Sequence, residues 1–225
     1  NEFFTRRFKP DARPVAAPDD RKVIVSPCES RPYRIARDVK RQDDFWIKGQ
    51  PYSLTDMLAG DATVDDFVGG IIYQAFLSAF NYHRWHSPVD GTILEARKVE
   101  GTYFSEAESE GEDPIGPNHS QAYLTHVAAR TIIHIMADDP AIGHMVVMPV
   151  GMGEISSCVI APGIKAGARV AKGAELGYFQ YGGSTVCCLF RPDAVATFAL
   201  GALPEPDHPH PPLTRVNTFL ARAAD

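Results

Sequence analysis

The chain has 225 residues, of which 44% are hydrophobic and 22% are charged, and its formal net charge is −6. This length suffices for one domain with its own hydrophobic core, and the composition is that of a water-soluble globular protein. The negative charge argues against nucleic acid or an anionic membrane surface as a partner. No apolar run approaches the roughly 18 residues of a membrane span and no signal peptide is recognisable, so we expect a soluble, cytoplasmic protein without a stable membrane anchor.

The four cysteines give no sign of a disulfide framework or of a zinc-binding CxxC pair. They are Cys28, Cys158, Cys187 and Cys188. The adjacent residues Cys187 and Cys188 would point to opposite faces of a strand. We therefore expect reduced thiols, as in a cytosolic protein.

The N-terminal segment is expected to hold an extended arm and one short strand. Prolines interrupt the basic residues 1–20, which predicts a helix end followed by an arm lying on the body of the protein. Residues 22–27 predict a buried strand that is stopped by a proline and delivers Glu29 to the strand end. A carboxylate at a strand end can take part in chemistry, although an exposed glutamate is the commoner case.

The clearest helical pattern in the chain follows Thr63. Residues 52–58 first predict a short helix. Thr63 and Asp66 then have the spacing of a capping box, and apolar residues recur at helical intervals as far as Phe80. We therefore predict one long helix over residues 64–80, with a glycine pair that permits close packing at a cost to helix stability.

The densest group of reactive side chains comes directly after this predicted helix. It consists of Tyr82, His83, Arg84, Trp85, His86 and Asp90. His83 and His86 would share a face if the segment were helical and would lie on opposite faces if it were extended. No third ligand stands at a recognisable spacing, so we assign no metal, and a pair of structural hydrogen-bonding histidines is the simplest alternative.

The second half of the sequence predicts a mostly β structure. Strands are expected over residues 92–99, 131–135 and 144–150, and the acidic residues 106–119 are expected to form a solvated loop because they lack an EF-hand pattern. Residues 155–179 predict a strand, a turn and a strand, with glycine spacing that resembles the hairpins of lipoyl and biotinyl domains. The predicted fold class is α+β, mostly β, with a lipoyl-like barrel-sandwich core, one long helix and short flanking helices.

Beyond Pro192 the composition changes. The chain becomes rich in alanine and proline, so residues 193–225 are expected to form an extended tail with one terminal turn of helix. The body of the protein is then residues 1–192.

The segment Gly182-Gly183-Ser184-Thr185 carries the sharpest chemical signal. Two glycines free the backbone, so the hydroxyl of Ser184 can lie against the carbonyl carbon of Gly183. Attack there would exchange the peptide for an ester, and elimination by a nearby base would leave one chain ending at Gly183 and another beginning with a pyruvoyl group. On these residues alone, a glycine-rich turn between two strands is the simpler interpretation.

Six separated motifs change that balance, because they occur in the order found in the pyruvoyl-dependent phosphatidylserine decarboxylases. They are Phe3-Phe4-Thr5-Arg6, Ser26-Pro27, Tyr52-Ser53-Leu54, Tyr82 to Pro88, Pro149-Val150-Gly151, and Lys172 to Thr185. The chain resembles this family over most of its length. The resemblance implies that Ser184 becomes the pyruvoyl cofactor, that His86 and an acid assist self-cleavage, and that His83 serves the decarboxylation step.

Two departures from the family pattern bear on the site and the substrate. The family has Asp-Gly after Ser-Pro-Ala, whereas this chain has Glu29-Ser30, so the acid would be Glu29, with Asp90 as the nearest alternative. The usual Asn-Glu-Arg region is replaced by residues 123–130, which look like the soluble branch of the family that includes tryptophan decarboxylases.

The resemblance thus implies a carboxy-lyase that is cleaved into residues 1–183 and 184–225, with a catalytic domain over 1–192. Its pyruvoyl group would form a Schiff base with a free amino acid, which we expect to be aromatic, such as tryptophan. Tyr82 and Trp85 would contact this small-molecule substrate. Two alternatives stay open: a phosphatidylserine decarboxylase that makes phosphatidylethanolamine, and a non-cleaving relative that only binds a ligand. A homodimer is also left open.

Two other classes fit the sequence less well. A lipoyl-type carrier would need a lysine at its hairpin tip and would leave the histidine motif unexplained. A serine hydrolase would need a Gly-x-Ser-x-Gly elbow, which the sequence lacks.

Overall fold

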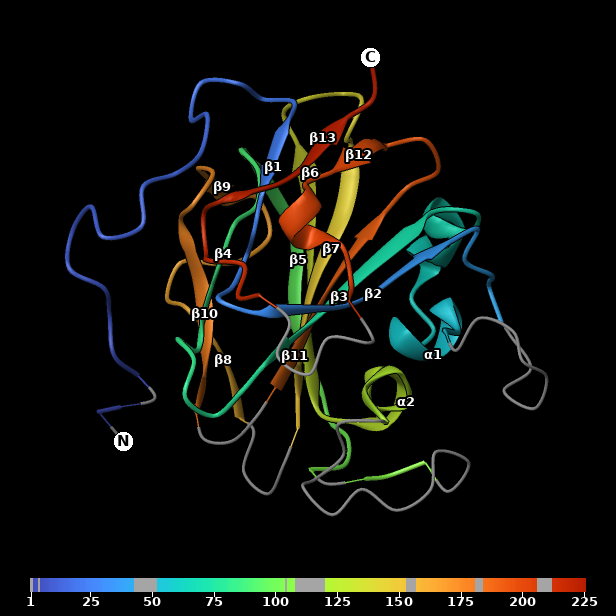
Figure 1. The fold of residues 1–225 in the computed structure, drawn as a ribbon. Coiled ribbons are helices and arrows are strands. Elements are labelled where there is room, and N and C mark those ends of the chain that lie inside the picture. The colour runs from blue at the N-terminus through green and yellow to red at the C-terminus, as the bar shows by residue number, and fades with distance from the viewer. Residues whose placement is uncertain are drawn as a thin grey trace.

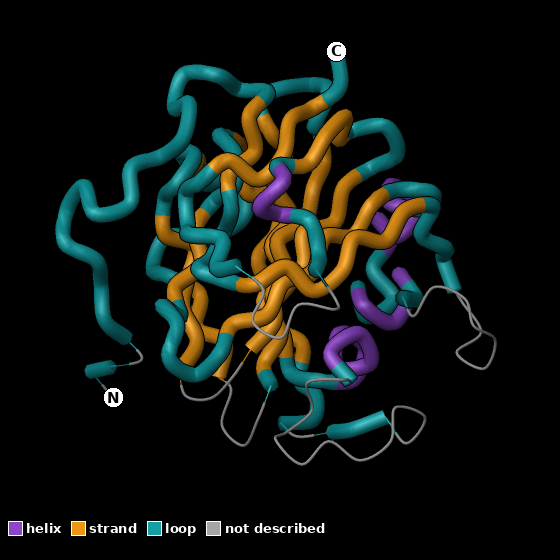
Figure 2. Tube along the Cα trace, viewed as in Figure 1, coloured by secondary structure: helices purple, strands orange, loops and turns teal. Residues whose placement is uncertain are grey.

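A computed structural model describes residues 2–3, 5–42, 52–103, 105–107, 120–152, 157–180, 184–205 and 212–225. Its centre is an antiparallel sheet of seven strands in the order β2-β3-β11-β7-β6-β5-β9. These strands are β2 (Arg31–Arg37), β3 (Ile71–Leu77), β5 (Gly91–Val99), β6 (Arg130–Ala137), β7 (His144–Gly151), β9 (Arg169–Val170) and β11 (Ser184–Phe190). The described part of the chain is thus mostly β, as predicted (Figure 2).

Two smaller sheets stand beside the central one. The first has the order β4-β10-β8 and the second the order β1-β13-β12. Their strands are β4 (Arg84–His86), β8 (Ser157–Ile160) and β10 (Glu175–Gln180), and β1 (Val23–Val25), β12 (Val195–Phe198) and β13 (Phe219–Ala223). Figure 1 shows β4, β10 and β8 on the side of the molecule along which the N-terminal arm runs. The lipoyl-like barrel-sandwich assignment stays a prediction.

Short helices lie away from those small sheets, on the side of β2 and β3 (Figure 1). They are α1 (Leu54–Met57), α2 (Gln121–Val127) and the 3₁₀ helix η1 (Ala62–Phe67); a further 3₁₀ turn, η3 (Leu200–Ala202), precedes the C-terminal strand. The short helix expected over residues 52–58 is confirmed by α1. None of the described helices is long and apolar enough to cross a membrane.

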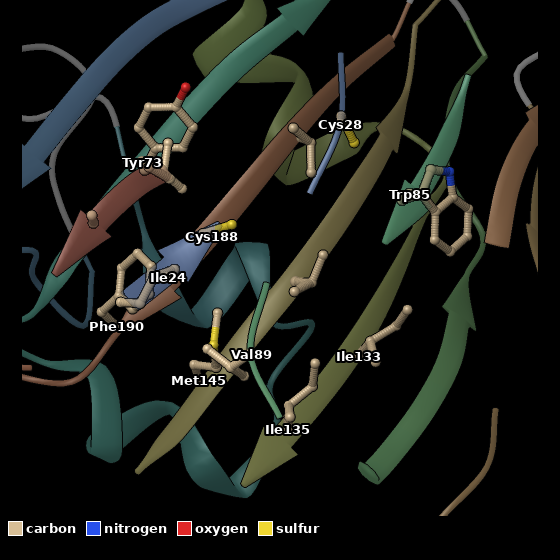
Figure 3. Packing of buried hydrophobic residues seen from close by; sticks show 14 of the residues in the cluster. Ile24, Cys28, Tyr73, Trp85, Val89, Ile133, Ile135, Met145, Cys188 and Phe190 are labelled. Carbon is tan, nitrogen blue, oxygen red and sulfur yellow. The ribbon is translucent and has the colours of Figure 1, made fainter. Parts of the chain in front are cut away.

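Strand β11 separates two hydrophobic cores. All seven of its residues are buried. Because side chains alternate across a strand, Cys188 packs in the core that contains Tyr73 and Trp85, and Cys187 packs in the core that contains Leu54. Figure 3 shows the first of these cores, with Tyr73, Cys188 and Phe190 together. All four cysteines are free, as the expectation of reduced thiols requires, and all four are buried.

The predicted long helix over residues 64–80 is wrong. The structure has only η1, capped by the side chain of Asp61, which accepts a hydrogen bond from the Thr63 amide at 2.8 Å. The chain then turns at Gly69, where φ is +79°, and continues as β3. Strand β3 is buried on both faces, so its apolar residues are continuous rather than alternating. Such a continuous apolar run also matches helical spacing, but in the structure it forms a strand that is buried between β2 and β11.

Other segments follow the predictions more closely. The strands expected over 92–99, 131–135 and 144–150 are confirmed as β5, β6 and β7, and the strand expected at 22–27 is confirmed as β1. The expected C-terminal tail differs, because β12 and β13 pair with each other and β13 pairs with β1, and the end is a strand rather than a turn of helix. Most of the acidic segment 106–119 lies outside the described residues, and the domain limits stay a prediction.

Candidate active site

Ser184 is the first residue of β11, in the middle of the central sheet. It lies between Leu77 of β3 and Gly151 of β7. Its side chain is fully buried, and its Oγ has no hydrogen-bond partner among the described residues. Leaving a buried hydroxyl unpaired costs about 1–3 kcal/mol, so a serine is a poor choice here for stability alone. The preceding glycines of the predicted cleavage site, Gly182 and Gly183, lie outside the described residues.

The side chain of Ser184 faces the small sheet that carries the two histidines. Residues 184, 186 and 188 share one face of β11. Val186 and Cys188 belong to the same core as Trp85 of β4 and Phe179 of β10. Ser184 therefore points toward the β4-β10-β8 layer.

The opposite face of the same strand is anchored by a buried polar network. Thr185 Oγ1 donates to the carbonyl of Ala75 at 3.0 Å and accepts from Gln74 Nε2 at 3.0 Å. Gln74 Nε2 also donates to the carbonyl of Gln121, and its Oε1 accepts from the Tyr52 hydroxyl at 2.5 Å. Gln74 was not predicted as a residue of the site, although a glutamine within an apolar run was a visible signal.

His83 lies at the same end of the strands as Ser184. Its carbonyl accepts from the Phe179 amide at 2.9 Å, and Phe179 precedes the segment that leads into Ser184. The turn that holds His83 follows Leu77 directly, and Leu77 pairs with Ser184. The ring is buried, and its edge faces the Phe179 ring with the centroids 6.4 Å apart.

The protonation of His83 follows from these surroundings. Burial lowers its pKa, and the hydrogen bond to the Ala79 carbonyl offsets this effect only in part. The ring is therefore neutral near pH 7. Its Nε2 donates to the Ala79 carbonyl at 3.1 Å. A neutral imidazole can accept a proton.

His86 lies at the other end of β4. It pairs with Glu175 at the start of β10, about 10 Å along the chain from His83 at about 3.3 Å per residue. Its Nδ1 donates to the Gly173 carbonyl at 2.7 Å, and its Nε2 accepts from the Tyr82 hydroxyl at 3.0 Å. Burial lowers the pKa of His86 and raises that of Tyr82 to about 12, so both side chains are neutral near pH 7.

A pocket of about 220 Å³ opens beside His86. Its wall includes His86, Tyr82, Glu175, Arg7, Phe8 and Arg13. Tyr82 lines this pocket, and its role in substrate binding stays a prediction. Trp85 is not among the residues that line this pocket: it is fully buried and packs on Phe179 with ring centroids 5.6 Å apart.

Neither predicted acid contacts the imidazole of His86 in this structure. Glu29 is 6% exposed, and its Oε1 accepts from Arg13 Nε at 2.5 Å. Asp90 instead accepts from the backbone amide of Lys172 at 2.9 Å. The backbone carbonyl of Gly173 therefore takes the orienting position that the sequence analysis gave to an acid. No pattern in the sequence marked Arg13 as the partner of Glu29.

Comparison with known proteins supports the motifs. The family described as "Phosphatidylserine decarboxylase" matches residues 1–202. The chain belongs to this family. The family predicted from the motifs is therefore confirmed.

Individual relatives add detail. Decarboxylase iboD of Amanita muscaria (strain Koide BX008) is 48% identical over 209 residues, which cover 87% of this chain and 59% of that protein. L-tryptophan decarboxylase of Psilocybe cubensis is 38% identical, over 87% of this chain and 47% of that protein. Phosphatidylserine decarboxylase proenzyme 3 of Schizosaccharomyces pombe is 34% identical, over 87% of this chain and 19% of that protein. The chain thus spans less than two thirds of the length of these relatives.

Proposed function

We propose that the chain is a pyruvoyl-dependent decarboxylase that cleaves itself between Gly183 and Ser184 and acts on a free amino acid. The observation that carries this proposal is the buried Ser184 hydroxyl, which has no hydrogen-bond partner among the described residues and faces the layer that holds His83. Family membership supports it, since members are named decarboxylases and one reported relative is named a proenzyme.

The cleavage chemistry needs only this chain and water. Attack of Ser184 Oγ on the Gly183 carbonyl carbon forms a C–O bond and breaks the C–N bond, and the hydroxyl proton passes to the freed nitrogen. Removal of the Cα proton of residue 184 then expels the Gly183 carboxylate. Hydrolysis of the resulting enamine leaves the pyruvoyl group and ammonia.

His83 is the histidine best placed to move these protons, because it is neutral and lies at the Ser184 end of the strands. His86, which the family resemblance implies for this role, is the alternative. In our proposal His86 and Tyr82 contact the substrate in the adjoining pocket. The pyruvoyl group supplies the electrophilic carbonyl that takes up the substrate amine and accepts the electrons released with carbon dioxide.

The proposed substrate is a free, aromatic amino acid such as tryptophan. Relatives at 48% and 38% identity are a decarboxylase and an L-tryptophan decarboxylase, and the phosphatidylserine decarboxylase reported above is more distant at 34%. The principal alternative is phosphatidylserine. Carbon dioxide release from tryptophan, phenylalanine, tyrosine and short-chain phosphatidylserine, measured side by side, distinguishes them, and turnover of the phospholipid alone would reject the substrate proposed here.

Intact-mass spectrometry of the purified protein tests the cleavage itself. We expect two chains that end at Gly183 and begin at residue 184, and we expect borohydride to add two hydrogens to the second chain by reducing its pyruvoyl ketone. The variant Ser184→Ala should remain one chain. A single wild-type chain with an unmodified serine after long incubation would support the non-cleaving, ligand-binding alternative.

A further inference from the structure

Three side chains of the kinds that bind metals lie close together and are not part of the proposed active site. They are Asp61 at the start of η1, Glu95 on β5 and His134 on β6. Glu95 and His134 are directly opposite each other in the β5–β6 pairing. One oxygen of each carboxylate and one ring nitrogen of His134 lie within 4.8 Å of one another. The proposed decarboxylation uses none of these residues.

Hydrogen bonds fix which nitrogen of His134 carries the lone pair. His144 Nδ1 donates to Asp66 Oδ2 at 2.7 Å, which leaves His144 Nε2 as an acceptor. His134 Nδ1 donates to that nitrogen at 2.9 Å. The lone pair of neutral His134 is therefore on Nε2. A histidine whose second nitrogen is fixed by a carboxylate-linked partner is typical of metal ligands.

The lone pair of His134 points at a carboxylate. Its Nε2 is 3.5 Å from Asp61 Oδ2. His134 is only 2% exposed, and this nitrogen makes no hydrogen bond to any described residue. Two lone pairs that face each other in a buried place repel unless a cation lies between them.

The charge around the site also favours a cation. Arg97 Nη2 is 3.2 Å from Asp61 Oδ2, and Arg97 Nε is 3.4 Å from Glu95 Oε1. One guanidinium therefore faces two carboxylates, which leaves an excess of negative charge.

We propose that Asp61, Glu95 and His134 form a binding site for one divalent transition-metal ion, with Zn²⁺ as the best match. One imidazole and two carboxylates suit zinc, whereas calcium and magnesium prefer oxygen ligands alone. The Glu95 side chain is 47% exposed, so an ion can enter from solvent. A bound ion would join the start of η1 to β5 and β6. Arg97 would move off the two carboxylates while its Nη2 keeps the bond of 2.8 Å to the Leu58 carbonyl.

Zinc titration of the whole, chelator-treated chain tests this proposal. Isothermal calorimetry and metal analysis after dialysis should give one Zn²⁺ per chain, with no comparable uptake of Mg²⁺. Glu95→Gln changes a half-exposed side chain and should fold normally, and it should weaken zinc binding at least tenfold, as should His134→Gln. Arg97→Gln should tighten binding because it removes a competing positive charge. Co²⁺ should give visible absorption bands in the wild-type chain and lose them in Glu95→Gln.

Adventitious binding has its own control. The sequence also holds two closely spaced histidines outside the proposed site, His208 and His210, which could bind zinc weakly. The double variant His208→Ala/His210→Ala should still bind one zinc ion per chain with unchanged affinity. The proposal is overturned if the wild-type chain takes up no stoichiometric zinc, if Glu95→Gln binds zinc as the wild type does, or if the His208/His210 variant loses it. Each result is independent of whether the chain cleaves itself.

Discussion

The buried network beneath Thr185 allows a quantitative prediction about how the reactive serine is held. Gln74 joins Tyr52 and the Gln121 carbonyl, on the helix side, to Thr185, the neighbour of Ser184. Replacing Gln74 by methionine keeps the side-chain length but leaves the Tyr52 hydroxyl and the Gln121 carbonyl without this partner. Each group left unpaired in a buried place costs about 1–3 kcal/mol.

We therefore expect Gln74→Met to lower the free energy of unfolding by about 3 kcal/mol in total. For a chain of this size each kcal/mol corresponds to about 2–4 °C, so thermal unfolding should begin roughly 6–12 °C lower. Tyr52→Phe removes one hydroxyl and should cost about 1 kcal/mol. The double variant should lose less than the sum of the two, because both substitutions break the same hydrogen bond.

The same variants measure positioning separately from stability. If the network sets the position of β11, Gln74→Met should slow the conversion of Ser184 at a temperature where circular dichroism shows it fully folded. Gln74→Glu is the matched control, since a protonated carboxyl can still accept from Tyr52 and donate to Thr185, and low pH should restore part of the rate. Additive stability losses, together with an unchanged cleavage rate in Gln74→Met, would refute this reasoning.

Three further predictions concern the roles of the two histidines, the pH dependence of stability and one buried ion pair. His83→Ala should lose most cleavage and His86→Ala should cleave but turn over poorly, as denaturing gels and carbon dioxide assays can show; the reverse pattern would favour the role that the family resemblance gives to His86. Burial lowers the pKa of His126 in the folded protein to about 4, below its value of about 6.5 in the unfolded chain. As the pH falls below about 6.5, the unfolded state therefore binds a proton that the folded state does not bind. Stability should thus decrease by roughly 3 kcal/mol between about pH 6.5 and 4, and His126→Gln should flatten this part of the pH profile of thermal unfolding; an unchanged profile would contradict it. Arg13→Ala should destabilise the fold by leaving the Glu29 carboxylate buried and unpaired, and the double variant Arg13→Ala/Glu29→Gln should recover most of the loss.

Local pattern alone did not single out Ser184, because its glycines also fit a plain turn, and the resemblance carried by six separated motifs was needed to favour a cleavage site, which stays a prediction. The strands with clear alternation or flanking turns were correctly placed. The failure at residues 64–80 has a physical cause: Ile71 to Leu77 is buried on both faces, so its apolar residues are continuous, show no strand alternation and also match helical spacing. Gly70 was the residue that could have argued for a strand rather than a helix, because it marks a close approach of two backbones. A Cβ at this position would lie 2.1 Å from the Phe190 carbonyl oxygen of β11.

The partners of the reactive groups could not be predicted, because they come from distant parts of the chain. Arg13 reaches Glu29 from the N-terminal arm, and Gly173 reaches His86 from the loop before β10. Neither pairing follows a sequence spacing. Both are tertiary contacts between segments that are far apart in the sequence.

The N-terminal arm explains why a motif at the very start of the chain accompanies a reactive serine near its end. Arg6 Nη2 donates to the Asn81 carbonyl at 2.6 Å, and Arg84 donates to the Thr5 carbonyl at 2.5 Å, so the arm is fastened on both sides of His83. Phe8 then stacks on Tyr82 with the ring centroids 4.1 Å apart. Because Tyr82 donates to His86, the arm also fixes the hydrogen bond that orients this imidazole. Residues of the arm line the pocket together with His86 of β4, so we propose that the arm takes part in selecting the substrate.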